Sequence, residues 1–218
     1  MANKQFAVIG LGRFGTALCQ ELSLQNVELM AIDIDGAQVK NVADIATHSL
    51  RADTTDEAAV KELGLEAFDI VFVAIGDNVK ASILTTLILK EAGIRSVWVK
   101  AKNKNHARIL QKIGADKVIN PERAMGQRIA HSMVDRRVFD SLDLGSNLQL
   151  TEMVITSSVS GIRLDAHPLF GVPELILLAL KRGPKVYAPL EPDLELLTSD
   201  ILIFIGPREV IQQQLSLL

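Results

Sequence analysis

The feature that most constrains the fold is a glycine-rich loop placed directly after a short apolar run. Residues 6–9 (Phe-Ala-Val-Ile) are typical of a parallel strand covered on both faces. The next residues include Gly10, Gly12 and Gly15, and an amphipathic stretch over about residues 16–24 follows. Gly10 permits a tight turn, Gly12 lets the backbone approach a bound group, and Gly15 allows close packing of helix on strand. The pattern predicts a strand–loop–helix unit that can hold a phosphate at the helix N-terminus.

The rest of the first 120 residues alternates strand-like and helix-like segments. Strands are expected at residues 28–32, 49–51, 70–74, 96–100 and 117–119, with helices at 36–46, 57–63, 79–92 and 106–113. Short connections in such a series predict a parallel sheet with right-handed crossovers. The fold class is therefore α/β, with a Rossmann-like doubly wound sheet.

The pattern changes after residue 120. A helical stretch is expected over about residues 121–138, and the Gly, Ser and Asn residues within 144–147 are interpreted as a linker. Beyond it, strand-like pieces at 150–155, 175–180, 186–188 and 201–205 and a helical tail predict a small α+β domain. We expect one domain over residues 1–140 and a second over 148–218. A domain of that size can form only a small hydrophobic core, so we expect it to pair with a second copy.

Composition excludes several classes of protein. The 218 residues carry a formal net charge of −3 without a basic stripe, which argues against nucleic acid as a partner. The single cysteine, Cys19, excludes a disulfide within one chain and indicates a reducing compartment. No apolar run approaches the roughly 20 residues needed to cross a bilayer as a helix. We therefore expect a cytoplasmic chain without a membrane span.

Asp33 lies 18 residues after Gly15, at the end of the expected second strand. An acid in that position accepts hydrogen bonds from ribose hydroxyls and disfavours a 2′-phosphate, so NADP is an unfavourable ligand. The alternative is a glycine turn that binds nothing. Arg13, inside the loop, suits a terminal phosphate because its guanidinium binds phosphate in a bidentate way. Alternatively, the guanidinium of Arg13 is exposed to solvent while the aliphatic part of its side chain covers the helix.

Further polar residues follow the other strands, where ligands of doubly wound sheets bind. Asp53 is placed to meet an adenine amino group, or is an ordinary loop acid. Asp77 and Asn78 either approach the ribose and phosphates or cap the next helix. Lys100 ends the fifth strand and is directed at the same crevice, although a lone lysine is usually a surface residue. Glu122 follows the sixth strand, where a divalent cation would be needed to hold a carboxylate near phosphates; alternatively it only complements the helix dipole.

The sequence contains no recognisable catalytic or metal-binding constellation. His48, His106, His131 and His167 form no metal-spaced pair, and His106 and His131 are expected on helix surfaces. No HExxH, GxSxG or Walker lysine motif occurs. Nucleotide sensing therefore fits better than hydride transfer. An NAD-dependent oxidoreductase and a redox-sensing NAD(H)-binding regulator remain as alternatives.

Several blocks of this sequence resemble the regulatory subunits of Ktr and Trk potassium-uptake systems. The likeness covers nearly all of residues 4–140 and rests on residues 4–15, 74–76, 82–87, 97–101, 112–116 and 120–126. It implies an RCK (KTN) domain followed by an RCK-C (TrkA-C) domain, and a regulatory protein rather than an enzyme. The family resemblance also implies an octameric ring, a tetramer of dimers, docked under a membrane potassium-translocating subunit (KtrB-like) at the inner face of the cell membrane.

The resemblance implies a ligand and a set of residues that bind it. The ligand is ATP or ADP, with NAD(H) possible, and ATP and ADP shift the ring between conformations. Arg13 would contact the terminal phosphate of ATP in the neighbouring subunit, and Glu122 would coordinate Mg²⁺ or Ca²⁺ at the dimer interface. Some relatives bind a cyclic dinucleotide in the C-terminal domain, but no residue set here supports that transfer. The implied nucleotide-binding residues are Gly10, Gly12, Arg13, Phe14, Gly15, Asp33, Ile34, Ala52, Asp53, Ile75, Gly76, Asp77 and Lys100.

Overall fold

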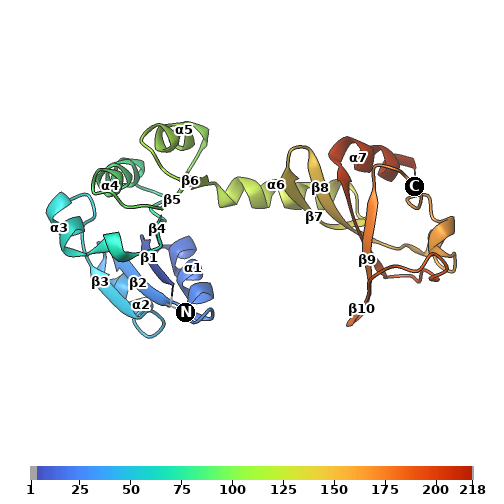
Figure 1. Ribbon diagram of the computed structural model, residues 1–218, viewed down its shortest axis with the longest axis horizontal. Helices are drawn as coiled ribbons and strands as arrows, with labels where there is room; N and C mark the ends of the chain where they lie inside the picture. Colours follow the sequence, from blue (N-terminus) through green and yellow to red (C-terminus); the bar gives the residue numbers. More distant parts are fainter. Residues whose placement is uncertain (1–3, 218) are drawn as a thin grey trace. The chain divides into compact units, whose positions relative to one another are not determined.

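The computed structural model of the protein describes residues 4–217. The chain forms two compact units, with the division in sequence between Pro121 and Glu122. No helix among the described residues is both long and apolar enough to cross a bilayer. The expected α/β sheet followed by a small α+β domain is confirmed, and each unit is described below by itself (Figure 1).

The first unit is built on a six-stranded parallel sheet. Its strand order is β3-β2-β1-β4-β5-β6, the order of a doubly wound nucleotide-binding fold. The chain reverses its winding direction between β1 and β4, and a crevice forms at the carboxyl ends of strands at such a point. The strands are β1 (Gln5–Ile9), β2 (Glu28–Asp33), β3 (His48–Arg51), β4 (Ile70–Val73), β5 (Val97–Lys100) and β6 (Lys117–Ile119).

Helices cover both faces of this sheet and create two apolar cores. Residues of α1 and α2 pack with one core, which contains Cys19, while residues of α3, α4 and α5 pack with the other, which contains Leu89 and Leu110. The strands alternate their side chains between these cores, so their inner positions are apolar on both faces. The helices are α1 (Arg13–Ser23), α2 (Gly36–Asn41), α3 (Glu57–Glu62), α4 (Val79–Glu91) and α5 (Lys104–Lys112), with a short 3-10 helix at Leu65–Ala67.

Four of these helices begin at a side-chain cap. In α2, α3, α4 and α5 the capping side-chain oxygen accepts a hydrogen bond from a backbone N–H of the first turn. A cap of this kind stabilises a helix by about 1 kcal/mol. The α1 helix differs, because its cap residue Gly12 has no side chain to offer. The capping residues are Asp35, Asp56, Asn78 and Asn103.

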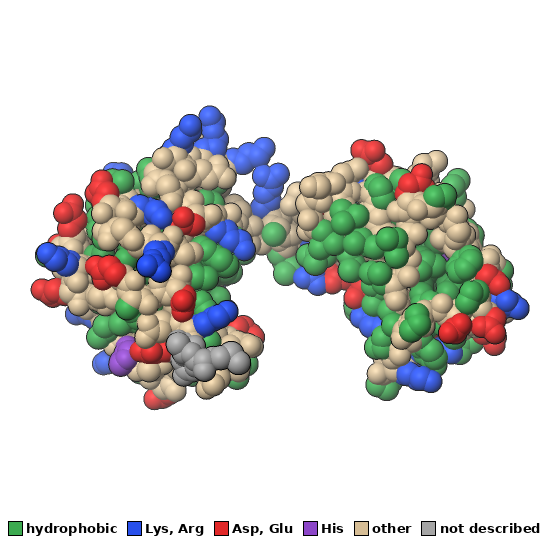
Figure 2. Space-filling model, viewed as in Figure 1, with side chains coloured by type: hydrophobic (Ala, Val, Ile, Leu, Met, Phe, Trp, Pro, Cys, Tyr) green, Lys and Arg blue, Asp and Glu red, His purple; other side chains and the backbone are tan. Residues whose placement is uncertain are grey.

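The second unit is a five-stranded antiparallel sheet with a helix at either end of its sequence. The strand order is β10-β9-β11-β8-β7. Phe204, Met153 and Leu180 lie in its core, while many apolar side chains stay on the surface (Figure 2). The elements are α6 (Pro121–Val134), β7 (Val138–Gly145), β8 (Leu148–Val154), β9 (Ile176–Arg182), β10 (Lys185–Tyr187), β11 (Ile201–Pro207) and α7 (Arg208–Leu217).

The prediction of a linker at residues 144–147 is wrong. Leu144 and Gly145 end β7, and Ser146 and Asn147 form the turn to β8; Gly145, Ser146 and Asn147 all have positive φ angles. Positive φ explains the Gly–Asn composition that suggested a linker. The helix also ends at Val134 rather than near Val138, which begins β7. The α6 helix thus falls almost wholly within the second unit, whereas the sequence grouped it with the first domain.

The prediction that His106 is a surface residue is also wrong. Its side chain is buried, and Nδ1 accepts a hydrogen bond from the backbone N–H of Lys102 at 3.2 Å. Burial lowers the pKa of this imidazole, which favours its neutral form. His106 thus closes the turn that starts α5. The side chain of His131 lies outside the described residues.

We expect Cys19 to be unreactive in the folded protein. The side chain is fully buried between α1 and the sheet, and burial raises its pKa to about 11, so the reactive thiolate is scarce at neutral pH. A thiol reagent such as dithionitrobenzoate should label the native chain far more slowly than the chain in guanidinium. A Cys19→Ala variant supplies the blank. Equal labelling rates in the two states would contradict the buried placement.

Candidate functional site

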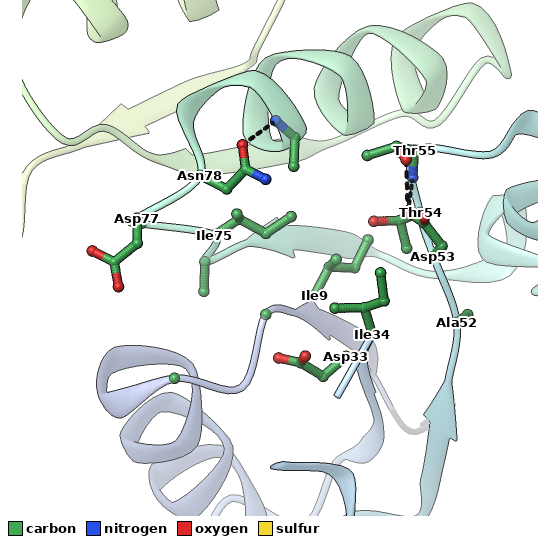
Figure 3. A pocket seen from close by; sticks show the side chains of 15 residues that line it. Ile9, Asp33, Ile34, Ala52, Asp53, Thr54, Thr55, Ile75, Asp77 and Asn78 are labelled. Carbon is green, nitrogen blue, oxygen red and sulfur yellow. Dashed lines mark hydrogen bonds between the residues drawn. The ribbon is translucent and has the colours of Figure 1, made fainter. Parts of the chain in front are cut away.

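A cavity of about 350 Å³ opens at the carboxyl edge of the parallel sheet (Figure 3). Its walls come from the segments that follow β1, β2, β3 and β4, so the topology gathers residues that are far apart in sequence. This is the crevice where ligands bind in doubly wound folds. The lining residues are Ile9, Gly10, Gly12, Asp33, Ile34, Ala52, Asp53, Thr54, Thr55, Ala74, Ile75, Gly76, Asp77, Asn78 and Ala81.

The three glycines of the loop have separate structural reasons. Gly10 has φ +94°, and a Cβ there would lie 2.9 Å from the backbone nitrogen of Ile75. A Cβ at Gly15 would overlap the carbonyl oxygen of Gly10. A Cβ at Gly12 would meet nothing within 4 Å, since this residue borders the open cavity. Two glycines are therefore required by packing, and the third keeps space free beside the N-terminus of α1.

Asp33 joins the end of β2 to the glycine loop. Its Oδ2 accepts a hydrogen bond from the backbone N–H of Leu11 at 2.6 Å, and its Oδ1 accepts one from the N–H of Asp35 at 2.8 Å. A carboxylate has about four lone-pair positions, so both oxygens can still accept another donor. The side chain borders the cavity and is only partly exposed. This fixed carboxylate can receive hydroxyl groups of a ligand.

The segment after β3 forms another wall. The Oδ1 atom of Asp53 accepts hydrogen bonds from the hydroxyl and the backbone N–H of Thr55, at 2.7 and 3.0 Å. Both bonds hold the pKa of the Asp53 carboxyl below its usual value, so the group is ionised at neutral pH. The hydroxyl of Thr54 lies 2.9 Å from that of Thr85, a buried residue of α4. The wall is thereby attached to α4.

The segment after β4 closes the cavity. Ile75 supplies an apolar surface, and Asp77 is exposed at the rim. Asn78 lines the cavity and also caps α4, because its Oδ1 accepts a hydrogen bond from the N–H of Ala81 at 3.1 Å. The capping alternative for Asn78 is therefore realised in the structure, while Asp77 makes no cap.

Four of the residues that were predicted to bind the nucleotide do not line this cavity. Gly15 is buried beneath the loop, and Arg13 is exposed as the first residue of α1. The Phe14 ring packs 5.8 Å from that of Phe72, and the Lys100 ammonium lies 5.4 Å from the centre of the Phe14 ring. Lys100 also borders Gly76, where a Cβ would sit 3.4 Å from Nζ. Phe14 therefore packs against β4, and Lys100 lies beside the Phe14 ring and close to Gly76, which follows β4.

Glu122 occupies the first turn of α6, at the start of the second unit. Both hypotheses for Glu122, coordination of a cation and a favourable interaction with the helix dipole, place it at the start of a helix. Its local position therefore does not decide between them. Within residues 4–217, no cluster of three or more His, Cys, Asp or Glu side chains is arranged to hold a metal ion. A cation at Glu122 would need oxygen ligands from elsewhere, such as a phosphate.

Thr54 and Thr55 are the polar lining residues that sequence reasoning missed. They directly follow Asp53, at the carboxyl edge where parallel strands present their next residues. The same strand-end rule that selected Asp53 would have found them, had it been extended by two positions. Ala81, one turn into α4, carried no such signal because its side chain is neither polar nor glycine-like.

Comparison with protein families and solved structures places this site in context. The family model described as the TrkA-N domain matches residues 6–121. Ktr system potassium uptake protein A of Vibrio alginolyticus is 45% identical, over 98% of this chain and 97% of that protein. Ktr system potassium uptake protein C of Bacillus subtilis (strain 168) is 48% identical, over 93% of this chain and 92% of that protein.

These matches first define the class of the protein, which is that of proteins built on a TrkA-N domain. Within that class, the chain belongs to the Ktr system potassium uptake proteins. The names of these relatives denote potassium uptake proteins and not enzymes, which agrees with the absence of a catalytic motif in the sequence.

Solved structures share the fold. The GsuK channel superposes with a TM-score of 0.70 at 14% identity, over 97% of this chain but 38% of that chain. A GsuK channel bound to NAD gives a TM-score of 0.54 at 18% identity, over the whole of this chain and 39% of that one. The TrkA-N domain of the inner membrane protein ybaL from Escherichia coli gives 0.52 at 17% identity, over 62% of this chain and 97% of that domain.

We expect Gly15→Ala and Gly12→Ala to separate the two kinds of loop glycine. The first variant forces a methyl group onto the Gly10 carbonyl and should lower the melting temperature clearly, because α1 must move away from β1. The second variant should melt close to the wild type, since its methyl group enters open space at an ordinary φ of −67°. Thermal unfolding followed by circular dichroism measures both. Equal losses of stability would contradict this assignment.

Proposed function

We propose that this protein is a nucleotide-sensing regulatory subunit that gates a membrane potassium-uptake protein. The observation that carries the proposal is the cavity built from a glycine loop and a fixed acid, in a chain nearly half identical to Ktr potassium uptake proteins. The first unit then serves as the RCK (KTN) sensor and the second as the RCK-C domain. The chain acts from the cytoplasmic face of the membrane through its partner.

The proposed ligands are ATP and ADP, with NAD(H) as a further occupant. Structural neighbours with the same fold are described as bound to NAD and as bound to ADP, which supports a nucleotide of this kind. The ribose would bind at Asp33, the adenine between Ile34, Ala52 and Asp53, and the phosphates beside Gly12. A 2′-phosphate would be repelled by the Asp33 carboxylate, so NADP should bind poorly.

Regulation follows from the difference in charge between the two nucleotides. ATP carries one more phosphate than ADP, and a ligand shifts a conformational equilibrium only by its differential affinity for the two states. In the proposed ring, a tetramer of dimers, Arg13 meets the terminal phosphate of a neighbouring subunit's ATP. The exposed apolar surface of the second unit supports association of copies. Rotation of subunits would then move the membrane partner.

Titration calorimetry tests the ligand class directly. The full chain should bind ADP, ATP and NADH, in competition with one another, and should bind NADPH far more weakly. Cyclic dinucleotides, titrated separately, report on the second unit. Potassium flux through the reconstituted partner should differ between ATP and ADP. If the chain binds none of ADP, ATP and NADH, the proposed function is contradicted.

We expect Asp33→Ala to weaken ADP and ATP alike, because both share the same ribose. Loss of a charged hydrogen-bond partner corresponds to about 1.5–3 kcal/mol of binding free energy. Calorimetry of both nucleotides measures it, with Asp44→Ala as control, since Asp44 is an exposed acid of the same unit that does not line the cavity. Unchanged ADP affinity would remove Asp33 from the site.

We expect Arg13→Ala to weaken ATP far more than ADP, because the guanidinium is proposed to meet the phosphate that ADP lacks. The melting temperature should stay near that of the wild type, since Arg13 is exposed. Arg95→Ala removes an exposed arginine that does not line the cavity and should change neither affinity. Equal losses for both nucleotides would place Arg13 away from the terminal phosphate.

We expect Glu122→Gln to abolish the stimulation of ATP-dependent flux by Mg²⁺ or Ca²⁺ while ATP still binds. The carboxylate is proposed to coordinate the cation together with phosphate oxygens. The matched control is Glu209→Gln, because Glu209 is likewise an acid in the first turn of its helix. A glutamine variant at position 122 that keeps the full cation response would leave only the helix-dipole role.

A further inference from the structure

Thr16 holds two successive carbonyl groups of the glycine loop. Its hydroxyl Oγ1 donates a hydrogen bond to the carbonyl oxygen of Leu11 at 2.8 Å, and its backbone N–H donates one to the carbonyl oxygen of Gly12 at 2.9 Å. We propose that Thr16 is a positioning residue, which latches the loop in the shape that receives the phosphates of the nucleotide. This inference rests on the proposed nucleotide-binding function.

The latch acts on Leu11, a residue whose N–H and carbonyl groups are both held by side chains. The N–H of Leu11 is bound by the Asp33 carboxylate, its carbonyl is bound by Thr16, and its side chain is fully buried. The neighbours of Leu11 on either side are Gly10 and Gly12, which have the greatest backbone freedom of any residue type. Without the hydroxyl of Thr16, this segment would have to be ordered when the ligand binds, at a cost in affinity.

The position of the latch also determines which part of a nucleotide should bind more weakly when the Thr16 hydroxyl is removed. The N–H of Leu11 already donates to Asp33, so it is engaged before any ligand arrives. The backbone N–H groups at the start of α1 have no acceptor within the helix. A phosphate bound there depends on the path of Gly12, whereas the ribose is proposed to bind at Asp33 and the base at the segment after β3, and the Thr16 hydroxyl bonds to neither. Loss of the latch should therefore weaken ADP and leave adenosine nearly unchanged.

The experiment compares Thr16→Val with Thr16→Ser in the full chain. Valine replaces the hydroxyl by a methyl group of similar size, and serine keeps the donor. Thr86→Val is the matched control, because the Thr86 hydroxyl donates to the carbonyl of Ser82 at 2.7 Å, within α4 and away from the cavity lining. Calorimetry with ADP and with adenosine is the readout, and thermal unfolding reports stability.

We expect Thr16→Val to bind ADP about three- to tenfold more weakly, the size of one net hydrogen bond, with adenosine affinity within twofold of wild type. Thr16→Ser should recover wild-type affinity, and Thr86→Val should retain it. Amide hydrogen exchange without nucleotide should be faster at Leu11 and Gly12 in the valine variant. If valine folds poorly, Thr16→Ala, which adds no methyl group, takes its place.

The outcomes separate this latch from the proposed function. If wild type binds ADP but Thr16→Val binds it equally well, the latch is wrong and the nucleotide function stands. Equal losses for ADP and adenosine, or a serine variant as weak as valine, would also overturn the latch. A wild-type chain that does not bind ADP would overturn the proposed function, and the positioning role of Thr16 with it.

Discussion

The close approach of α1 to the end of β1 is the constraint on which the site depends. The backbone of Gly15 lies against the carbonyl of Gly10, with no room for a Cβ between them. This contact directs the N-terminus of α1 toward the crevice of the sheet. Only glycine at position 15 permits this contact. The absence of a Cβ atom at this residue therefore sets the position of the loop, the helix and the cavity beside them.

Charge is distributed unevenly around this cavity. Three acids, Asp33, Asp53 and Asp77, line it, whereas Arg13 and Lys100 lie outside its lining. An anionic ligand would therefore be attracted mainly by backbone N–H groups and by the helix dipole at α1, and repelled by acids elsewhere. Acids that accept hydrogen bonds from hydroxyl and amino groups favour the sugar and base of a nucleotide over further phosphates. The arrangement gives the cavity two ends of different chemistry.

Sequence patterns predicted the first unit well because its rules are local. A parallel strand is an apolar run in the sequence. Asp33, Asp53 and Asn78, which the strand ends selected, line one cavity, whereas Lys100 at the end of β5 does not. Predictions failed where a tertiary contact overrode a local pattern. Strand β7 was missed because Asp140 and Asp143 interrupt it, and Asp140 is tolerated there through its ion pair with Arg128 of α6. His106 is polar in sequence, but it is buried in the first turn of α5, where its ring accepts a hydrogen bond from the backbone N–H of Lys102.

The uncapped start of α1 has a consequence for how the first unit responds to its ligand. Among α1 to α5 in the described part of this unit, α1 alone begins without a side-chain cap, at Gly12. A phosphate oxygen at that position would complete the helix as a capping carboxylate or amide completes the others. The ligand would then take the place of the capping side chain that α1 lacks. Nucleotide binding would therefore supply a cap to the one helix of α1 to α5 that has none, and nucleotide release would remove that cap.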